Sequence, residues 1–258
     1  GQISLWVKKI KPSIIINTSA YTNVEKAEKE SEKAFIINSK ALQIISTEAL
    51  KINATLIHFS TDFVFDGFKK SPYIESDLTN PLNVYGKTKL MGECEIKKKL
   101  NKFFIFRTSW VHSFFGDNFL KKIINNAELK NMINVTNVEI GTPNSTNFLA
   151  NSTLKIIDML SIKNDHEIPY GLYHLSSLGE VSRYYYAKYI LKTAKRYNFD
   201  LLCDPKAVKS FISENYGTLR PKYSVLCSDL FKKTFDINIP RWQHGVIQSV
   251  RKLKNENE

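Results

Sequence analysis

Glycine, cysteine and long apolar runs are scarce in this chain of 258 residues. None of its ten glycines lies between Gly1 and Gly67, which excludes a glycine-rich, phosphate-binding turn from that stretch. The three cysteines, Cys94, Cys203 and Cys227, form neither a disulfide framework nor a metal-ligand pattern, so we expect a reducing compartment and no metal. No apolar run approaches the ~20 residues of a membrane-spanning helix. Without a secretory leader pattern at residue 1, the sequence predicts a cytoplasmic protein with no membrane partner.

Arginine is also scarce, although the chain is basic, with a formal net charge of +12. Six of its 37 basic residues are arginines, and the rest are lysines. Proteins that recognise bases and phosphates favour arginine, because its planar fork donates two parallel hydrogen bonds. A lysine excess spread along the chain indicates compositional bias instead, so we do not expect nucleic acid as a partner.

Strand-like and helix-like patterns alternate along the first half of the chain. Short apolar runs typical of buried parallel strands lie at 14–16, 55–60 and 103–108. Three- and four-residue apolar spacing or helix boundary signals predict helices over 3–10, 28–51, 83–99 and 118–128. This alternation predicts an α/β fold, a Rossmann-like doubly wound parallel sheet with helices on both faces.

The second half is less regular. We expect helices over 148–160, 181–196 and 242–253, a short strand at 171–175 and an irregular segment over 214–226.

A tyrosine and a lysine, Tyr85 and Lys89, lie four residues apart near the start of the helix expected over 83–99. This spacing places the phenol and the ammonium on one face of a helix. A nearby cation stabilises phenolate and so lowers the pKa of a tyrosine toward the range of a proton donor. Taken alone, the pair also fits a half-buried tyrosine beside a solvated lysine.

Hydroxyl-bearing and other polar residues, with an acid and an indole among them, stand at the end of each of the three strands expected in the first half. They are Asn17 to Ser19, Ser60 to Asp62 and Thr108 to Trp110. In open parallel sheets, ligands bind beyond the carboxyl ends of the strands. The same residues could simply cap turns.

Together these stretches resemble the extended short-chain dehydrogenase/reductases, and among them the dTDP-4-dehydrorhamnose reductase family. The motifs are AYTNVEKAE at 20–28, STDFVFDG at 60–67, PLNVYGKTKLMGE at 81–93, RTSWV at 107–111, GTP at 141–143 and Arg220-Pro221. The likeness covers essentially the whole chain, and its motifs stand in the order that the family has.

The resemblance implies a hydride transfer from NADPH or NADH to the 4-keto carbon of a nucleotide-linked deoxysugar, dTDP-4-dehydrorhamnose. Thr61, Tyr85 and Lys89 match the catalytic residues of the family. Tyr85 would protonate the developing alkoxide, Thr61 would hydrogen-bond the same oxygen, and Lys89 would lower the pKa of Tyr85 and bind the nicotinamide ribose. This general acid help is worth ~10²–10⁴-fold in rate.

Two sets of binding residues follow from the same resemblance. The cofactor set is Ala20, Tyr21, Thr22, Tyr85 and Lys89, and the set for the nucleotide-sugar substrate is Thr61, Asp62, Trp110 and Arg220. Arg220 could instead form a structural salt bridge.

Since the family's glycine-rich turn has no counterpart here, we expect the first strand, turn and helix, about 40 residues, to be missing. We therefore predict a truncated NAD(P)-binding Rossmann domain over 1–140 and a mainly substrate-binding lobe, interleaved with it, over 141–258.

Some positions depart from the family. Phe63 stands where a tyrosine is usual, and Val225 and Cys227 replace polar residues of some relatives. Some relatives dimerise through acidic residues that bind a metal. A homodimer is therefore possible here, but we find no matching acidic cluster and predict no metal.

Two other functions remain open at this stage. The regulatory subunit of methionine adenosyltransferase resembles the same family without catalysing hydride transfer, and the missing glycine turn would suit such a subunit. An epimerase or dehydratase acting on a related nucleotide sugar would keep the fold but return its cofactor unchanged. Trp110 favours the reductase, because its flat indole suits a sugar nucleotide.

Overall fold

A four-stranded parallel sheet forms the centre of the computed structural model, which describes residues 1–130, 132–208 and 218–256. Its strands, in spatial order, are β1 (Ile14–Asn17), β2 (Thr55–Thr61), β3 (Phe103–Thr108) and β8 (Gly171–His174). All three neighbouring pairs are parallel. The sequence predicts the first three of these for the sheet. The short strand predicted at 171–175 is β8, and its membership of the sheet was not predicted.

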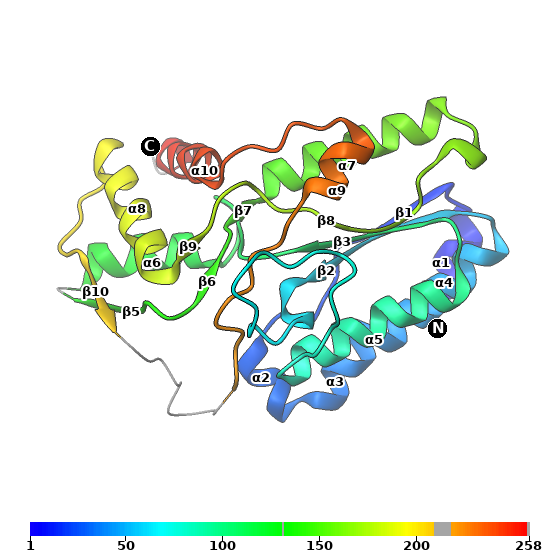
Figure 1. Cartoon of the computed structure of the whole chain (residues 1–258), viewed down its shortest axis with the longest axis horizontal. Helices are drawn as coiled ribbons and strands as arrows, with labels where there is room; N and C mark the ends of the chain where they lie inside the picture. The colour runs from blue at the N-terminus through cyan, green and yellow to red at the C-terminus, as the bar shows by residue number, and fades with distance from the viewer. Residues whose placement is uncertain (131, 209–217, 257–258) are drawn as a thin grey trace.

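Helices cover both faces of this sheet (Figure 1). On one face, α1 (Gln2–Ile10), α4 (Ala41–Lys51) and α5 (Val84–Lys99) lie against a core that includes Leu42, Leu56, Ile96 and Ile105. On the other face, α7 (Thr146–Ile162) and α9 (Asp229–Phe235) pack on Ile57, Phe104 and Phe106. Because neighbouring strand residues point to opposite faces, Leu56 and Ile57 belong to different cores. The predicted doubly wound fold is confirmed.

The helix predicted over 28–51 is divided in the structure. It consists of α2 (Val24–Lys29), α3 (Ser31–Phe35), a π-helical turn at Ile36–Lys40 and α4. The π-helical turn lies where α5 crosses most closely, since a Cβ on Gly92 would come within 2.2 Å of the Asn38 carbonyl oxygen. Such turns concentrate at functional sites, and this one carries the buried Asn38.

A second core lies beside the sheet in the C-terminal part of the chain (Figure 1). It is enclosed by α6 (Phe119–Leu129), α8 (Arg183–Arg196) and α10 (Trp242–Glu256), with a parallel pair of β5 (Ile133–Thr136) and β10 (Pro205–Val208). Two-residue strands also pair: β4 (Val111–His112) with β7 (Asn144–Ser145), and β6 (Ile140–Gly141) with β9 (Val181–Ser182). The helices predicted over 118–128, 181–196 and 242–253 are confirmed. The β5–β10 pair, the two-residue pairs and α9 were not predicted. Residues 214–217 of the predicted irregular segment lie outside the described residues.

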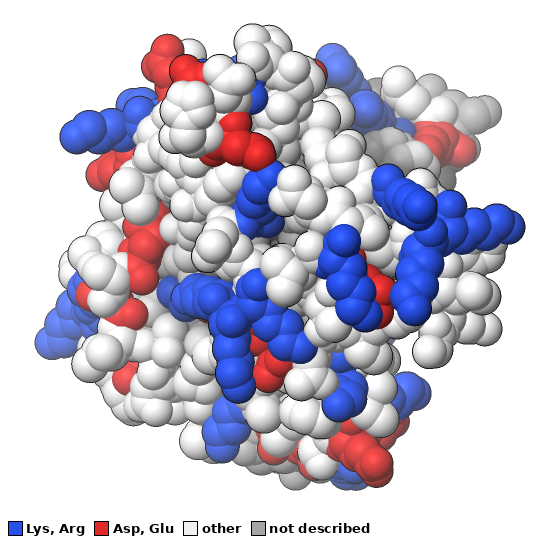
Figure 2. All heavy atoms as spheres, turned by 90° about the vertical axis from the view of Figure 1, so that its right-hand side faces the viewer, with Lys and Arg blue, Asp and Glu red and all other residues white. Residues whose placement is uncertain are grey.

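Charge is distributed without strong segregation on the face that Figure 2 shows, where basic and acidic side chains are interspersed. Within the described ranges, no helix is long and apolar enough to cross a membrane.

Candidate active site

Two cavities meet at the carboxyl ends of β2 and β3. The first has a volume of about 440 Å³, and its lining includes Thr61, Asp62, Tyr85, Trp110 and Arg183. The second, of about 630 Å³, is lined by Ala20, Thr22, Tyr85 and Lys89 together with apolar residues of β1, β2 and α7. Tyr85 and Thr22 line both. The structure thus brings most of the predicted residues to one place, with the phenol at the shared wall.

The start of α5 fixes the position of Tyr85. The side chain of Asn83 caps the helix by accepting a hydrogen bond from the Gly86 amide at 2.8 Å. Gly86 packs against the turn that follows β2, where a Cβ would lie 2.2 Å from the Phe63 carbonyl oxygen. The glycine therefore lets the helix approach the turn, and the Phe63 and Tyr85 rings meet edge to face at 5.7 Å.

Thr61 and Asp62 form the polar end of the first cavity. The Thr61 hydroxyl lies 3.1 Å from Oδ1 of Asp62 and accepts a hydrogen bond from the Phe63 amide at 3.1 Å. Asp62 is 2% exposed, and burial raises its pKa to about 6. Its other carboxylate oxygen, Oδ2, has no hydrogen-bond partner among the described residues. An unpaired, buried oxygen in a cavity wall is suited to accept a hydrogen bond from a ligand.

Burial also controls Tyr85. It raises the pKa of the phenol to about 12; the negative charge of Asp62 acts in the same direction, and a hydrogen bond with Thr61 opposes it. At neutral pH the phenol therefore keeps its proton. That state suits a proton donor. The sequence led us to expect that Lys89 lowers this pKa, but in the structure the pKa is raised, and Lys89 is not among the groups that act on it.

Lys89 is buried one helical turn further along α5. Its ammonium donates to the Phe59 carbonyl oxygen at 2.6 Å and lies 3.3 Å from Nε2 of His58. Burial lowers the pKa of Lys89 to about 8, opposed by the negative charge of Glu93. His58 is buried, and its ring faces this lysine.

Trp110 takes an unusual backbone conformation, with φ at 42°, which is costly for a bulky residue and is typical of functional sites. Its indole lies against Gly141, where a Cβ would come within 2.6 Å of the ring. The guanidinium of Arg183 covers the ring at 3.5 Å from its centroid and pairs with Glu139 at 3.4 Å.

Sequence reasoning missed Arg183. One signal could have found it, because it is one of six arginines and lies near the start of the helix predicted over 181–196.

The three residues of the segment 20–22 differ in whether their side chains face the second cavity. Ala20 and Thr22 line the second cavity. The phenol of Tyr21 instead donates to Glu30 at 3.0 Å. Asn38 from the π-helical turn holds the Tyr21 backbone, accepting from its amide at 2.8 Å and donating to its carbonyl at 3.1 Å. Asn38 thus fixes the backbone of Tyr21, while the Tyr21 side chain points to Glu30 and does not line the cavity.

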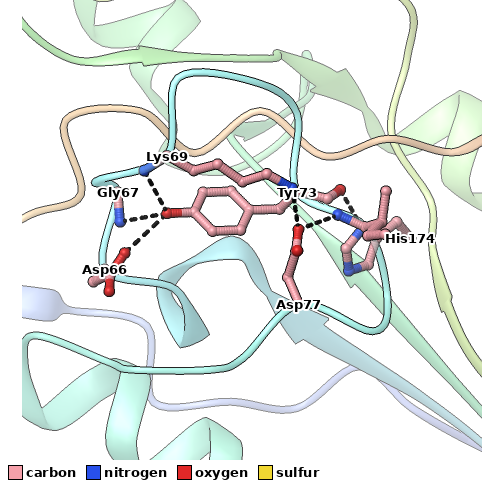
Figure 3. A network of polar contacts seen from close by, with 7 residues as sticks. Asp66, Gly67, Lys69, Tyr73, Asp77 and His174 are labelled. Carbon is pink, nitrogen blue, oxygen red and sulfur yellow. Dashed lines mark hydrogen bonds and ion pairs between the residues drawn. The ribbon is translucent and has the colours of Figure 1, made fainter.

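A network of hydrogen bonds in the loop between β2 and α5 attaches this loop to β8 of the sheet (Figure 3). The Tyr73 phenol accepts from the amides of Gly67 at 3.0 Å and Lys69 at 3.3 Å and donates to Asp66 at 2.9 Å. The Tyr73 carbonyl lies 3.0 Å from Nδ1 of the buried His174 on β8. This network closes the loop on itself and attaches it to the sheet.

The same loop positions Arg220. At Gly67, φ is 78° and a Cβ would lie 2.6 Å from the Lys222 amide, so glycine allows the loop to touch the segment after Arg220. Arg220 itself forms an ion pair with Glu25 of α2. It does not belong to the lining of the first cavity as described. The structure therefore shows the salt bridge that was the alternative, and a contact with substrate stays a prediction.

A buried ion pair lies directly beneath the site. Arg107 of β3 donates twice to Glu93 of α5, at 2.9 and 2.7 Å, and the Ser60 hydroxyl donates to the same carboxylate at 2.6 Å. This cluster joins β2, β3 and α5, and so holds the strand ends against the helix that carries Tyr85 and Lys89.

Comparison with known proteins agrees with this geometry. The family model described as the RmlD substrate binding domain matches residues 2–255. The dTDP-4-dehydrorhamnose reductase of Escherichia coli K12 is 36% identical over 247 residues, which cover 96% of this chain and 82% of that relative. The enzyme of the same name from Sinorhizobium fredii is 34% identical over 250 residues, covering 96% and 81%.

Solved structures are similar as well. A dTDP-4-dehydrorhamnose reductase from Clostridium acetobutylicum superposes with a TM-score of 0.88 at 31% identity, covering 98% of this chain and 85% of that one. The enzyme from Bacillus anthracis, solved in complex with NADP, gives 0.84 at 31% identity, covering 97% and 84%. More distant solved structures at 12–16% identity share the fold alone. The chain belongs to the RmlD family of dTDP-4-dehydrorhamnose reductases, within the extended short-chain dehydrogenase/reductases.

Proposed function

We propose that this protein reduces the 4-keto group of dTDP-4-dehydrorhamnose with NADPH or NADH and so forms dTDP-L-rhamnose. The observation that carries the proposal is the position of Tyr85 at the wall between two cavities. One cavity offers Thr61, Asp62 and Trp110, and the other offers Lys89 among apolar walls. Family membership supports the same reaction, since the relatives carry that enzyme name and one solved neighbour contains NADP.

The second cavity suits the nicotinamide half of the cofactor. Its walls include Ile16, Phe59 and Leu149, which fit a flat ring, and the ammonium of Lys89 supplies a hydrogen-bond donor for ribose hydroxyls. Bound NADPH or NADH supplies the hydride. The residues described contain no glycine-rich turn for the pyrophosphate, so the fit concerns the nicotinamide and its ribose.

The reacting oxygen of the substrate would lie between Thr61 and Tyr85. Tyr85, protonated at neutral pH, donates its proton to that oxygen as the alkoxide forms, and Thr61 holds the oxygen by a hydrogen bond. The unpaired Oδ2 of Asp62 accepts from a sugar hydroxyl. Trp110 and Arg183 form a flat, positively charged wall for the nucleotide diphosphate. Arg220 would reach the same anion after leaving Glu25.

The division into a cofactor-binding domain over 1–140 and a mainly substrate-binding lobe over 141–258 stays a prediction. In the proposed site, Thr61, Asp62 and Trp110 contribute to the substrate cavity from the first part and Arg183 from the second. The homodimer and the cytoplasmic location also stay predictions.

The test is cofactor oxidation by the protein expressed from its complete gene, followed by absorbance with dTDP-4-dehydrorhamnose as substrate. Tyr85→Phe should lower kcat by ~10²–10⁴-fold, because the proton donor is lost while the ring remains. NADPH binding, measured by fluorescence, should persist in this variant. Wild-type turnover by Tyr85→Phe would disprove the donor role. Formation of an epimerised or dehydrated sugar without net cofactor oxidation, seen by NMR, would disprove the reductase itself.

A further inference from the structure

His58 is a buried titratable side chain that the proposed reaction does not use. It lies on β2, is 1% exposed, and points to the face of the sheet that α5 covers. Its two ring nitrogens have side-chain neighbours, Lys89 at 3.3 Å from Nε2 and Asn17 at 3.0 Å from Nδ1. Asn17 is also the register partner of His58 on β1. A line of polar groups therefore runs from β1 through β2 to Lys89 on α5.

The hydrogen bonds of the Lys89 ammonium explain why this line matters. An ammonium has three N–H donors and no acceptor. One donor goes to the Phe59 carbonyl at 2.6 Å, and a second faces Nε2 of His58. The third is left for the cavity that Lys89 lines together with Tyr85. Two contacts from β2 thus set the direction in which the remaining donor points.

These contacts also determine the tautomer of His58. Because Lys89 in its charged form can only donate, Nε2 must be the unprotonated nitrogen, and Nδ1 must carry the ring proton. An acceptor is then needed next to Nδ1. The Asn17 atom at 3.0 Å from Nδ1 is the amide nitrogen Nδ2, and two donors cannot pair. We therefore assign the amide the opposite orientation, which places its oxygen next to Nδ1. A backbone hydrogen bond with Asn17 acts on the same ring. Asn17 therefore orients the histidine that orients the lysine.

The charged surroundings keep His58 in this state. Burial and the neighbouring Lys89 hold the pKa of His58 well below its usual value, so the ring is neutral at the pH at which the enzyme would work. On α5, Glu93 acts on Lys89 with its negative charge, and Glu93 is itself paired with Arg107 of β3. On β2 the group facing Lys89 is His58, and on β1 the neutral Asn17 faces His58.

We infer that His58, oriented by Asn17, is a positioning residue that holds the Lys89 ammonium charged and directs its free N–H toward the cofactor ribose and Tyr85. This inference rests on the proposed function. Its role is distinct from packing, because an apolar side chain of similar size would fill the same space but leave a buried ammonium donor without a partner.

The experiment compares His58→Leu with His58→Gln in the reductase assay. The leucine variant should lower kcat about ten- to hundredfold at saturating cofactor, the cost of an unpaired donor on a buried charge. Its KM for the sugar nucleotide should change little. Since the charged form of Lys89 loses an acceptor, the pKa of Lys89 should fall, and the limb of the pH profile that follows it should move to lower pH. The glutamine variant, whose amide oxygen can accept, should recover most of kcat.

A second measurement does not depend on turnover. NMR of the protein with isotope-labelled lysine side chains, assigned with Lys89→Met, reports the Lys89 pKa directly. It should fall in His58→Leu and, by a smaller amount, in Asn17→Leu, which keeps the ring but removes its orienting partner. The matched control is Leu56→Ala, on the same face of β2. It should lower stability without moving the pH profile or the Lys89 pKa.

The outcomes separate this inference from the proposed function. If Tyr85→Phe retains full turnover, the catalytic assignment fails, whatever His58 does. If Tyr85→Phe is impaired while His58→Leu keeps the wild-type kcat, pH profile and Lys89 pKa, the positioning role is wrong. Equal loss in the leucine and glutamine variants, with no shift of the pKa, would show that His58 serves packing alone.

Discussion

Two polar clusters lie one residue apart at the end of β2, and they differ in how completely their groups are paired. Ser60 points toward α5, where Glu93 and Arg107 form a buried, doubly hydrogen-bonded pair. Thr61 points the other way, toward Asp62 and Tyr85 in the wall of a cavity. In the first cluster both carboxylate oxygens have partners, and only Nη1 of Arg107 lacks one among the described residues. In the second cluster a carboxylate oxygen itself, Oδ2 of Asp62, has no partner among the described residues.

The difference shows how one strand end can supply both support and chemistry. A paired cluster fixes the strand, the neighbouring strand and the helix relative to each other. A cluster with unpaired groups is less favourable for folding and is retained where a ligand can complete it. The alternation of side chains along β2 separates the two tasks. We call the group of Ser60, Glu93 and Arg107 the closed cluster, and the group of Thr61, Asp62 and Tyr85 the open cluster. The closed cluster should therefore mainly determine the stability of the fold, and the open cluster should mainly determine activity at some cost in stability.

The largest change in stability should come from removing the cation of the closed cluster while its carboxylate remains. Arg107→Met leaves the Glu93 carboxylate buried without its cation, and we expect the free energy of unfolding to fall by ~3–5 kcal/mol. Urea unfolding followed by circular dichroism measures the change. The double variant Arg107→Met/Glu93→Leu removes the charge as well and should recover much of the loss. A double variant no more stable than Arg107→Met would mean that the pair contributes more than mutual neutralisation.

Asp62→Asn tests the opposite expectation for the open cluster. The pKa of Asp62 is raised from 3.8 to about 6, so the folded protein holds a proton that the unfolded chain has released between these values. Stability from this residue is therefore lost as pH rises from about 4 to about 6, and above that range the cost is up to about 3 kcal/mol. Asparagine has no such cost. The variant should be more stable than the wild type at pH 7, with the difference shrinking toward pH 4.5, while its KM for the sugar nucleotide rises.

Urea unfolding of both proteins at the two pH values isolates this residue, because the other titrating groups are common to them. If the variant and the wild type differ in stability by the same amount at pH 4.5 and pH 7, ionised Asp62 does not destabilise the folded protein.

The central strands and the site residues that lie close together in sequence could be predicted, because both leave local signals in the sequence. Short apolar runs predicted three of the four central strands as neighbours in a parallel sheet, and the spacing of Tyr85 and Lys89 follows from the geometry of one helix. The two-residue strand pairs have no periodicity to detect. Arg183 and Trp110 are 73 residues apart in sequence, and His58 and Lys89 are 31 apart. Contacts of this kind depend on how α5 and α8 dock, which no local pattern records.

The smallest expected effect concerns the edge of the closed cluster. Lys97 lies one turn from Glu93 on α5, with its ammonium 3.8 Å from the carboxylate, and its side chain is 44% exposed. Solvent screens such a pair, so Lys97→Gln should change the free energy of unfolding by less than ~0.5 kcal/mol. Removing the buried cation Arg107 would thus lower the free energy of unfolding by several kcal/mol, whereas removing the exposed cation Lys97 would hardly change it. Both cations face the same carboxylate, so burial, not charge alone, sets the strength of each interaction. Urea unfolding at low and high salt measures this, and a loss near that of Arg107→Met would show that the cluster is open to solvent from the Lys97 side.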